Sequence, residues 1–169
     1  MAKKQFFITI DTETTMSQKV ADFAAVVSDR KGRVIEQFAC LVGGVYDNRE
    51  NDPLFYDNSV GALWSKLNLD KRYKSYDTML SSGMRVLCAP SAINNWLGKC
   101  AAKYQPTLTA YNLSFDAGKC KNTGIDLSFF PNRFCLWKVS VYLYATTKNY
   151  LNFVMQQHAF NPPTKHGNM

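Results

Sequence analysis

The chain has 169 residues, 46% of them hydrophobic and 14% aromatic, which is enough to build the core of one ordinary domain. No stretch reaches the roughly 18 to 20 uninterrupted apolar residues of a membrane span, and the N-terminus carries no apolar secretory segment. We therefore expect one soluble, cytoplasmic domain. The formal net charge of +7 favours polyanionic partners such as nucleic acid, although it says nothing about the fold.

The five cysteines are widely spaced and include no C-x-x-C pair. An odd number without such pairs indicates neither a disulfide framework nor a zinc site. We interpret them as reduced, buried small hydrophobes: Cys40, Cys88, Cys100, Cys120 and Cys135.

The first part of the chain predicts a meander of three strands. Residues Gln5–Asp11 are rich in Phe and Ile and end at an acidic residue, which indicates a buried central strand with its polar end at the sheet edge. Two further β-rich runs, Val20–Ser28 and Arg33–Val42, flank the turn sequence Asp29–Gly32 and predict a hairpin.

Residues 43–83 have a different composition, in which polar residues are interrupted by aromatic ones. This composition predicts a long, partly helical insertion. We expect most of its aromatic side chains to stack the insertion on the core, and a role in gripping a substrate is the alternative.

The second part of the chain predicts helices and two short strands. Ser91 is a candidate N-cap for a helix with one apolar stripe, which contains Ile93, Trp96, Leu97, Cys100, Ala101 and Tyr104. A strand at Thr107–Tyr111 leads to a short helix that ends near Gly124. A strand piece is expected within Leu127–Leu136, and further helices at Lys138–Thr146 and Tyr150–His158.

The most informative residues for chemistry are acidic. Asp11 and Glu13 lie two positions apart at the end of the first strand, so their side chains project from the same face. Such a pair of carboxylates repels unless a cation lies between them, and oxygen ligands suit Mg²⁺ or Mn²⁺. Asp116 follows the strand at Thr107–Tyr111 and opens a helix, and it would face Asp11 if the two strands are neighbours.

Two segments carry a resemblance to a known family. F-F-I-T-I-D-T-E-T-T at residues 6–15 and Y-N-L-S-F-D at residues 111–116 resemble motifs I and II of the DEDD 3′→5′ exonucleases. This family includes polymerase proofreading subunits, ribonuclease T, oligoribonuclease and several phage exonucleases. The resemblance spans about residues 5–125, and residues 43–83 match it poorly.

The resemblance implies a fold and a metal site. The fold would be α/β and ribonuclease H-like, a mixed five-stranded sheet in the order 3-2-1-4-5 with strand 2 antiparallel and helices on both faces. Asp11 would bridge two Mg²⁺ or Mn²⁺ ions, Glu13 would complete the shell of the first, and Asp116 would bind the second. The substrate-binding residues would be Thr12, Thr14, Thr15, Asn112 and Phe115.

The chain departs from the family at motif III, a His or Tyr closely followed by an Asp. Its only histidines are His158 and His166, and its last acidic residue is Asp126. We interpret His158 as a capping or surface residue and take His166 as the candidate general base. The simplest interpretation is that residues 1–169 form a single exonuclease-like domain that is truncated at its C-terminus.

Two functions from different classes follow. The first is a metal-dependent 3′→5′ exonuclease that hydrolyses single-stranded DNA or RNA ends with two metal ions. The alternative is a catalytically silent module of the same fold that binds nucleic acid or a partner protein, including a second copy of the chain. A ribonuclease H-type endonuclease would share the fold and the metals, but the motif types argue against it.

Overall fold

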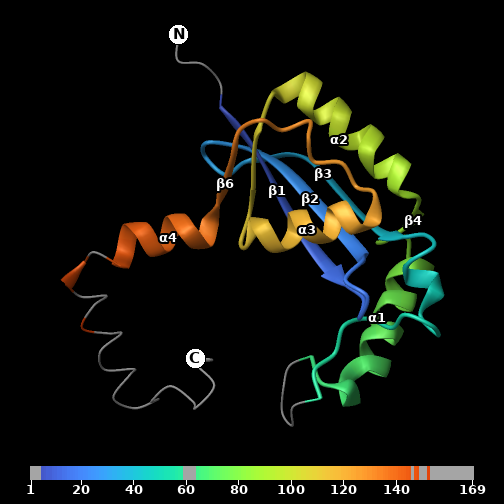
Figure 1. Cartoon of the computed structure of the whole chain (residues 1–169). Helices are drawn as coiled ribbons and strands as arrows, with labels where there is room; N and C mark the ends of the chain where they lie inside the picture. The colour runs from blue at the N-terminus through green and yellow to red at the C-terminus, as the bar shows by residue number, and fades with distance from the viewer. Residues whose placement is uncertain (1–4, 59–63, 146, 149–151, 153–169) are drawn as a thin grey trace.

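The computed structural model describes residues 5–58, 64–145, 147–148 and 152, and Figure 1 shows the arrangement of its elements. The strands are β1 (Phe6–Thr14), β2 (Val20–Asp29), β3 (Val34–Val42), β4 (Leu87–Cys88), β5 (Thr107–Ala110) and β6 (Arg133–Cys135). The helices are α1 (Leu69–Ser81), α2 (Pro90–Tyr104), α3 (Leu113–Thr123) and α4 (Leu136–Ala145), with short 3-10 turns η1 (Tyr46–Asn48) and η2 (Lys66–Asn68).

The strands form one mixed sheet in the order β4-β3-β2-β1-β5-β6. β2 is antiparallel to both β1 and β3, whereas β5 is parallel to β1 and β6 is parallel to β5. The α/β class and the mixed sheet are therefore confirmed. The described part of the sheet has six strands rather than the five expected, because Leu87–Cys88 pairs with the free edge of β3. A two-residue strand is too short to produce a recognisable sequence pattern.

Helices α2 and α3 cover one face of the sheet. Ile8 and Ile10 of β1 are buried on this face with Ile93 and Leu97 of α2. The aromatic ring of Trp96 stacks on Phe38 of β3 with their centroids 5.2 Å apart. The predicted apolar stripe of this helix is confirmed, although the helix begins at Pro90 with Ala89 as its N-cap and not with Ser91. Proline at the first helical position needs no capping of its missing N–H.

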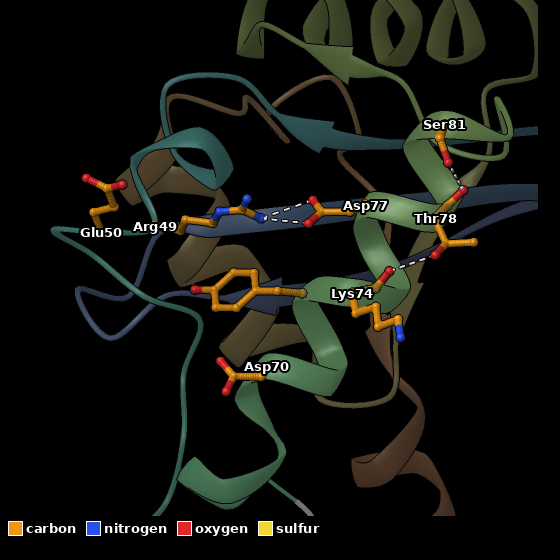
Figure 2. Close-up of a pocket in the computed structure, with 8 residues that line it drawn as sticks. Arg49, Glu50, Asp70, Lys74, Asp77, Thr78 and Ser81 are labelled. Atoms are coloured by element: carbon orange, nitrogen blue, oxygen red, sulfur yellow. Dashed lines mark hydrogen bonds and ion pairs between the residues drawn. The ribbon is translucent and has the colours of Figure 1, made fainter.

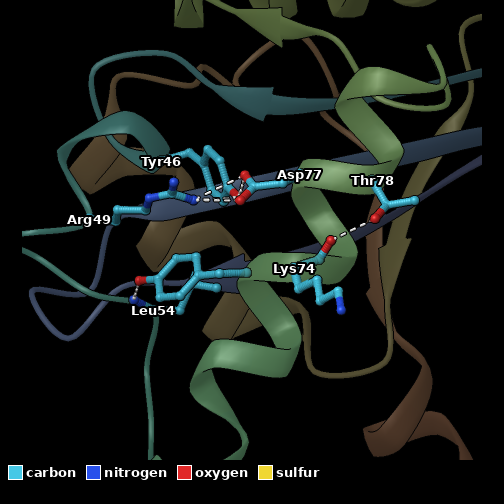
Figure 3. Close-up of polar contacts among 7 residues, drawn as sticks. Tyr46, Arg49, Leu54, Lys74, Asp77 and Thr78 are labelled. Carbon is cyan, nitrogen blue, oxygen red and sulfur yellow. Dashed lines mark hydrogen bonds and ion pairs between the residues drawn. The ribbon is translucent and has the colours of Figure 1, made fainter.

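The predicted insertion, residues 43–83, contains η1, η2 and α1, and Figure 1 shows α1 near the end of the sheet toward which β1 points. Tyr46 packs its ring against Tyr73 and Tyr76 of α1. Asp77 accepts hydrogen bonds from Tyr46 and from Arg49 (Figure 3). These contacts fasten the loop that follows β3 to α1, and Tyr73 and Tyr76 also pack against the buried core, as expected for aromatic residues of the insertion.

The last described helix, α4, begins two residues before the predicted Lys138 and extends away from the sheet (Figure 1). Trp137 and Tyr142 are among its exposed side chains. The helix predicted at Tyr150–His158 lies outside the described residues. Among the described residues, no helix has the length and apolar character needed to cross a membrane.

Candidate functional site

Asp11 and Glu13 lie within β1, not after it. β1 continues to Thr14 because β2 pairs with it along its whole length, with Glu13 opposite Asp22. The expectation that the strand ends at Asp11 is therefore wrong. Alternation along the strand still places both carboxylates on one face, opposite to the face that carries Ile8, Ile10 and Thr12.

The two carboxylates differ in exposure. Asp11 is exposed, and its side chain makes no hydrogen bond or ion pair with the other described residues. Glu13 is half-buried, and burial raises its pKa above the ordinary value. The guanidinium of Arg72 opposes this rise, whereas the neighbouring charges of Asp11 and Asp22 add to it. The negative charges of Asp11 and Asp22 thus make Glu13 harder to ionise, as expected where carboxylates converge.

Asp116 lies in the first turn of α3, and β5, which precedes this helix, is the parallel neighbour of β1. Its carboxylate is buried and accepts a hydrogen bond of 2.8 Å from the hydroxyl of Thr12. Burial raises the pKa of Asp116, the Thr12 hydrogen bond lowers it, and the charge of Asp11 raises it again. Asp116 is therefore close enough to Asp11 to interact electrostatically, although its hydrogen-bond partner lies on the other face of β1.

A fourth carboxylate, Asp22, belongs to the same face, and sequence reasoning missed it. It stands directly opposite Glu13 in the β1–β2 register and is only 7% exposed. Burial raises its pKa, while the ion pair with Arg85 and a hydrogen bond from Tyr76 lower it. The available signal was an acidic residue inside the otherwise apolar strand Val20–Val27, because a buried charge within a strand requires a partner.

Two arginines accompany these acids, one from the insertion and one from the loop that follows it. Arg72 of α1 lies 3.6 Å from Glu13, donates a hydrogen bond of 2.7 Å to the carbonyl of Phe55, and places its guanidinium 4.2 Å from the ring centroid of Trp64. Arg85 lies 3.3 Å from Asp22. The insertion therefore contributes positive charge directly beside the predicted acidic site.

The residues expected to bind substrate have different environments. Thr12, Thr14 and Thr15 are buried, and the backbone carbonyl of Thr14 accepts a hydrogen bond from Phe55. Asn112 is half-buried and precedes α3. Phe115 is exposed, with the ammonium of Lys119 4.6 Å from its ring centroid. Of this set, Phe115 is therefore the side chain most accessible to a ligand.

The fit of a divalent metal can be judged from the donor set. The oxygen ligands and the net negative charge of Asp11 and Glu13 suit Mg²⁺ or Mn²⁺. Asp116 is near but bonded to Thr12, and within the described ranges no three or more His, Cys, Asp or Glu side chains are grouped closely enough to hold a metal ion. His158 and His166, the latter expected as a general base, lie outside the described residues.

A pocket of about 630 Å³ lies between α1 and the loop that contains Arg49, and none of the predicted site residues lines it (Figure 2). Arg49 and Asp77 form an ion pair of 3.0 Å across it. Its other charged lining residues are Glu50, Asp70 and Lys74. This pocket therefore lies apart from the acidic face of the sheet, and its wall carries both signs of charge.

A search of the chain against protein-family models finds no matching family, and a search against curated proteins finds no matching protein.

Proposed function

We propose that the chain is the core of a metal-dependent 3′→5′ exonuclease acting on single-stranded DNA or RNA. The observation that carries the proposal is the placement of Asp11 and Glu13 on one face of the central strand, with Asp116 on the helix that follows the adjacent parallel strand. These are the elements on which the resemblance to the DEDD exonucleases rests.

The sheet gives further support. The run β3-β2-β1-β5-β6, with β2 antiparallel to its neighbours, agrees with the ribonuclease H-like arrangement that the resemblance implies. β4 adds one strand at the β3 edge. The strand order therefore supports a ribonuclease H-like fold for this chain.

In this proposal, Asp11 and Glu13 would hold the divalent ions, and Asp116 would contribute from the side of α3. When bound, the ions supply charge neutralisation at the scissile phosphate and activation of water. The residues of the chain have two tasks. Their carboxylates must be ionised to accept cations, and Thr12 positions Asp116 through its hydrogen bond. Glu13 must also exchange its contact with Arg72 for a metal ion.

The alternative function, a catalytically silent nucleic-acid-binding module, is favoured by a specific observation. Arg72 and Arg85 already supply positive charge to Glu13 and Asp22, which a structural acid–base cluster also requires. Such a module would bind an oligonucleotide without hydrolysing it.

One assay separates the two functions. A single-stranded oligonucleotide labelled at its 5′ end is incubated with the protein and Mn²⁺, and the products are resolved by length. The exonuclease gives a ladder that shortens from the 3′ end, and Asp11→Asn abolishes it. A parallel reaction with an RNA–DNA hybrid detects a ribonuclease H-type endonuclease, which would cut the hybrid internally. Intact oligonucleotide, despite demonstrated binding, establishes the silent module and contradicts the exonuclease.

A further inference from the structure

A second, smaller pocket lies beside the acidic face of the sheet. Its volume is about 280 Å³. Its polar and aromatic lining residues are Asp22, Trp64, Arg72, Ser75, Tyr76 and Arg85. Of these residues, Asp22 belongs to the sheet, and the others belong to the insertion and to the loop that follows α1. The pocket therefore joins the insertion to the strand that carries the acidic residues.

The positions of the two arginines are fixed by the fold. Arg72, Ser75, Tyr76 and Met79 are spaced at i, i+3, i+4 and i+7, so they share one face of α1. Arg85 follows α1, and its backbone N–H donates a hydrogen bond of 3.0 Å to the carbonyl of Met79. The side chains are thus presented by a helix and by a loop that is hydrogen-bonded to that helix, and not by free surface residues.

Both arginines retain hydrogen-bonding capacity. A guanidinium carries five N–H donors. Arg72 makes one hydrogen bond to Phe55 and one ion pair to Glu13, and Arg85 bonds to Asp22 and to the carbonyl of Met84. These contacts with the described residues use fewer donors than the two side chains possess. The remaining N–H groups are the donors that an anion in the pocket would use.

The chemistry of the pocket selects the class of anion. Arginine matches the oxygens of phosphate with paired hydrogen bonds, and this match is why arginine is common at phosphate sites. Aromatic side chains next to a basic groove are typical of sites for single-stranded nucleic acid, because bases stack on them. Trp64 is partly exposed beside Arg72. A phosphate with an attached nucleoside satisfies both features.

We propose that this pocket binds a backbone phosphate of a single-stranded nucleic acid, with Arg72 and Arg85 as its phosphate contacts. The inference rests on the proposed function, because Arg72 also touches Glu13 and so places the bound phosphate next to the hydrolytic site. The insertion then has a defined task, which is to hold the strand beside the carboxylates.

The test measures binding in EDTA, so that hydrolysis does not contribute. A fluorescein-labelled oligothymidylate is titrated with the wild type, Arg72→Gln or Arg85→Gln at several NaCl concentrations. The anisotropy of its fluorescence reports binding. Each lost phosphate contact reduces the slope of log affinity against log salt by about 0.7 for a single strand, and we expect about five- to tenfold weaker binding at low salt. Arg33→Gln is the matched control, because Arg33 also pairs with an aspartate but lies in the hairpin turn at the other end of the sheet.

Arg85→Gln leaves the buried carboxylate of Asp22 without its cation, so the double variant Asp22→Asn/Arg85→Gln removes both partners and keeps the fold testable. The proposal expects the same reduced slope from this variant, with cooperative thermal unfolding retained. A slope and affinity equal to those of Arg33→Gln would overturn it. If the wild type binds and the variants lose binding while Mn²⁺ produces no hydrolysis, the exonuclease function fails and the phosphate site stands. If the wild type hydrolyses while the variants bind normally, only the phosphate site fails.

Discussion

Glu13 and Asp22 face each other directly across the β1–β2 strand pair, and each carboxylate has an arginine from α1 or the loop that follows it as its ion-pair partner. Like charges in opposite positions of a strand pair destabilise a sheet. Arg72 and Arg85 offset this repulsion, so the insertion and the acidic face of the sheet depend on each other.

In the proposed metal site, Arg72 would compete with the divalent ion for Glu13. Replacing it by Gln removes a positive charge that lies 3.6 Å from the carboxylate. We expect Arg72→Gln to bind Mn²⁺ more tightly, on the order of tenfold, because a cation next to a metal site repels the ion. Isothermal calorimetry measures the change, with Arg33→Gln as the charge-matched control. Weaker metal binding in Arg72→Gln would mean that Arg72 positions Glu13 for the metal.

Thr12 stabilises the buried charge of Asp116. Thr12→Val leaves that carboxylate without its 2.8 Å hydrogen bond, and we expect a loss of about 1 to 3 kcal/mol in the free energy of unfolding. Because the hydrogen bond lowers the pKa of Asp116, the loss is larger at neutral pH, where the carboxylate is ionised, than in acid. Urea denaturation at two pH values measures both effects.

Thr109→Val is the matched control for Thr12→Val. The hydroxyl of Thr109 is buried on β5 and has no hydrogen-bond partner in the described structure. Its replacement by an isosteric apolar side chain should be neutral or should stabilise the protein by about 1 kcal/mol. Equal losses in the two variants would contradict the special role assigned to Thr12.

The stabilisation that metal binding gives should depend on pH. The pKa values of Glu13 and Asp116 are raised from 4.5 and 3.8, so the folded protein binds protons more tightly than the unfolded chain. In EDTA, these two groups therefore reduce stability as pH rises from their ordinary values through the raised ones. Mn²⁺ binds the deprotonated forms, so the increase in Tm that it causes should grow over the same pH range. A pH-independent increase would place the metal elsewhere.

The core under α2 determines the stability of the fold. Leu97 is fully buried, and Leu97→Ala should lower the free energy of unfolding by about 2 to 5 kcal/mol. Lys99→Ala, an exposed position of the same helix, should change it by less than about 0.5 kcal/mol. Urea denaturation of the two variants distinguishes them. Similar values for both would show that α2 does not pack on the sheet as described.

Sequence patterns anticipated the elements that have strong local signals. The hairpin at Asp29–Gly32 and the stripe of α2 are such elements, because turn residues and a helical period determine them locally. The continuation of β1 beyond Asp11 to Thr14 was not anticipated, since acidic residues are unusual inside a strand. Only pairing with β2, a tertiary contact, explains it.

The site was anticipated only in part, for a similar reason. The spacing of Asp11 and Glu13 is local information and places them on one face. The pairing of Asp22 with Arg85 joins residues 63 positions apart, and no pattern in either segment reveals it. The position of α1 beside the acids likewise depends on contacts of the insertion, such as the hydrogen bond of 2.8 Å that the hydroxyl of Tyr73 receives from the backbone of Leu54.

The central claim is that Asp11 and Glu13 form a divalent-metal site, and calorimetric titration of the protein with Mn²⁺ tests it most directly. We expect saturable binding that is lost in Asp11→Asn and weakened in Asp116→Asn, with unfolding curves showing that both variants are folded. Binding of the same strength in Asp11→Asn, or no binding by the wild type, would contradict the account.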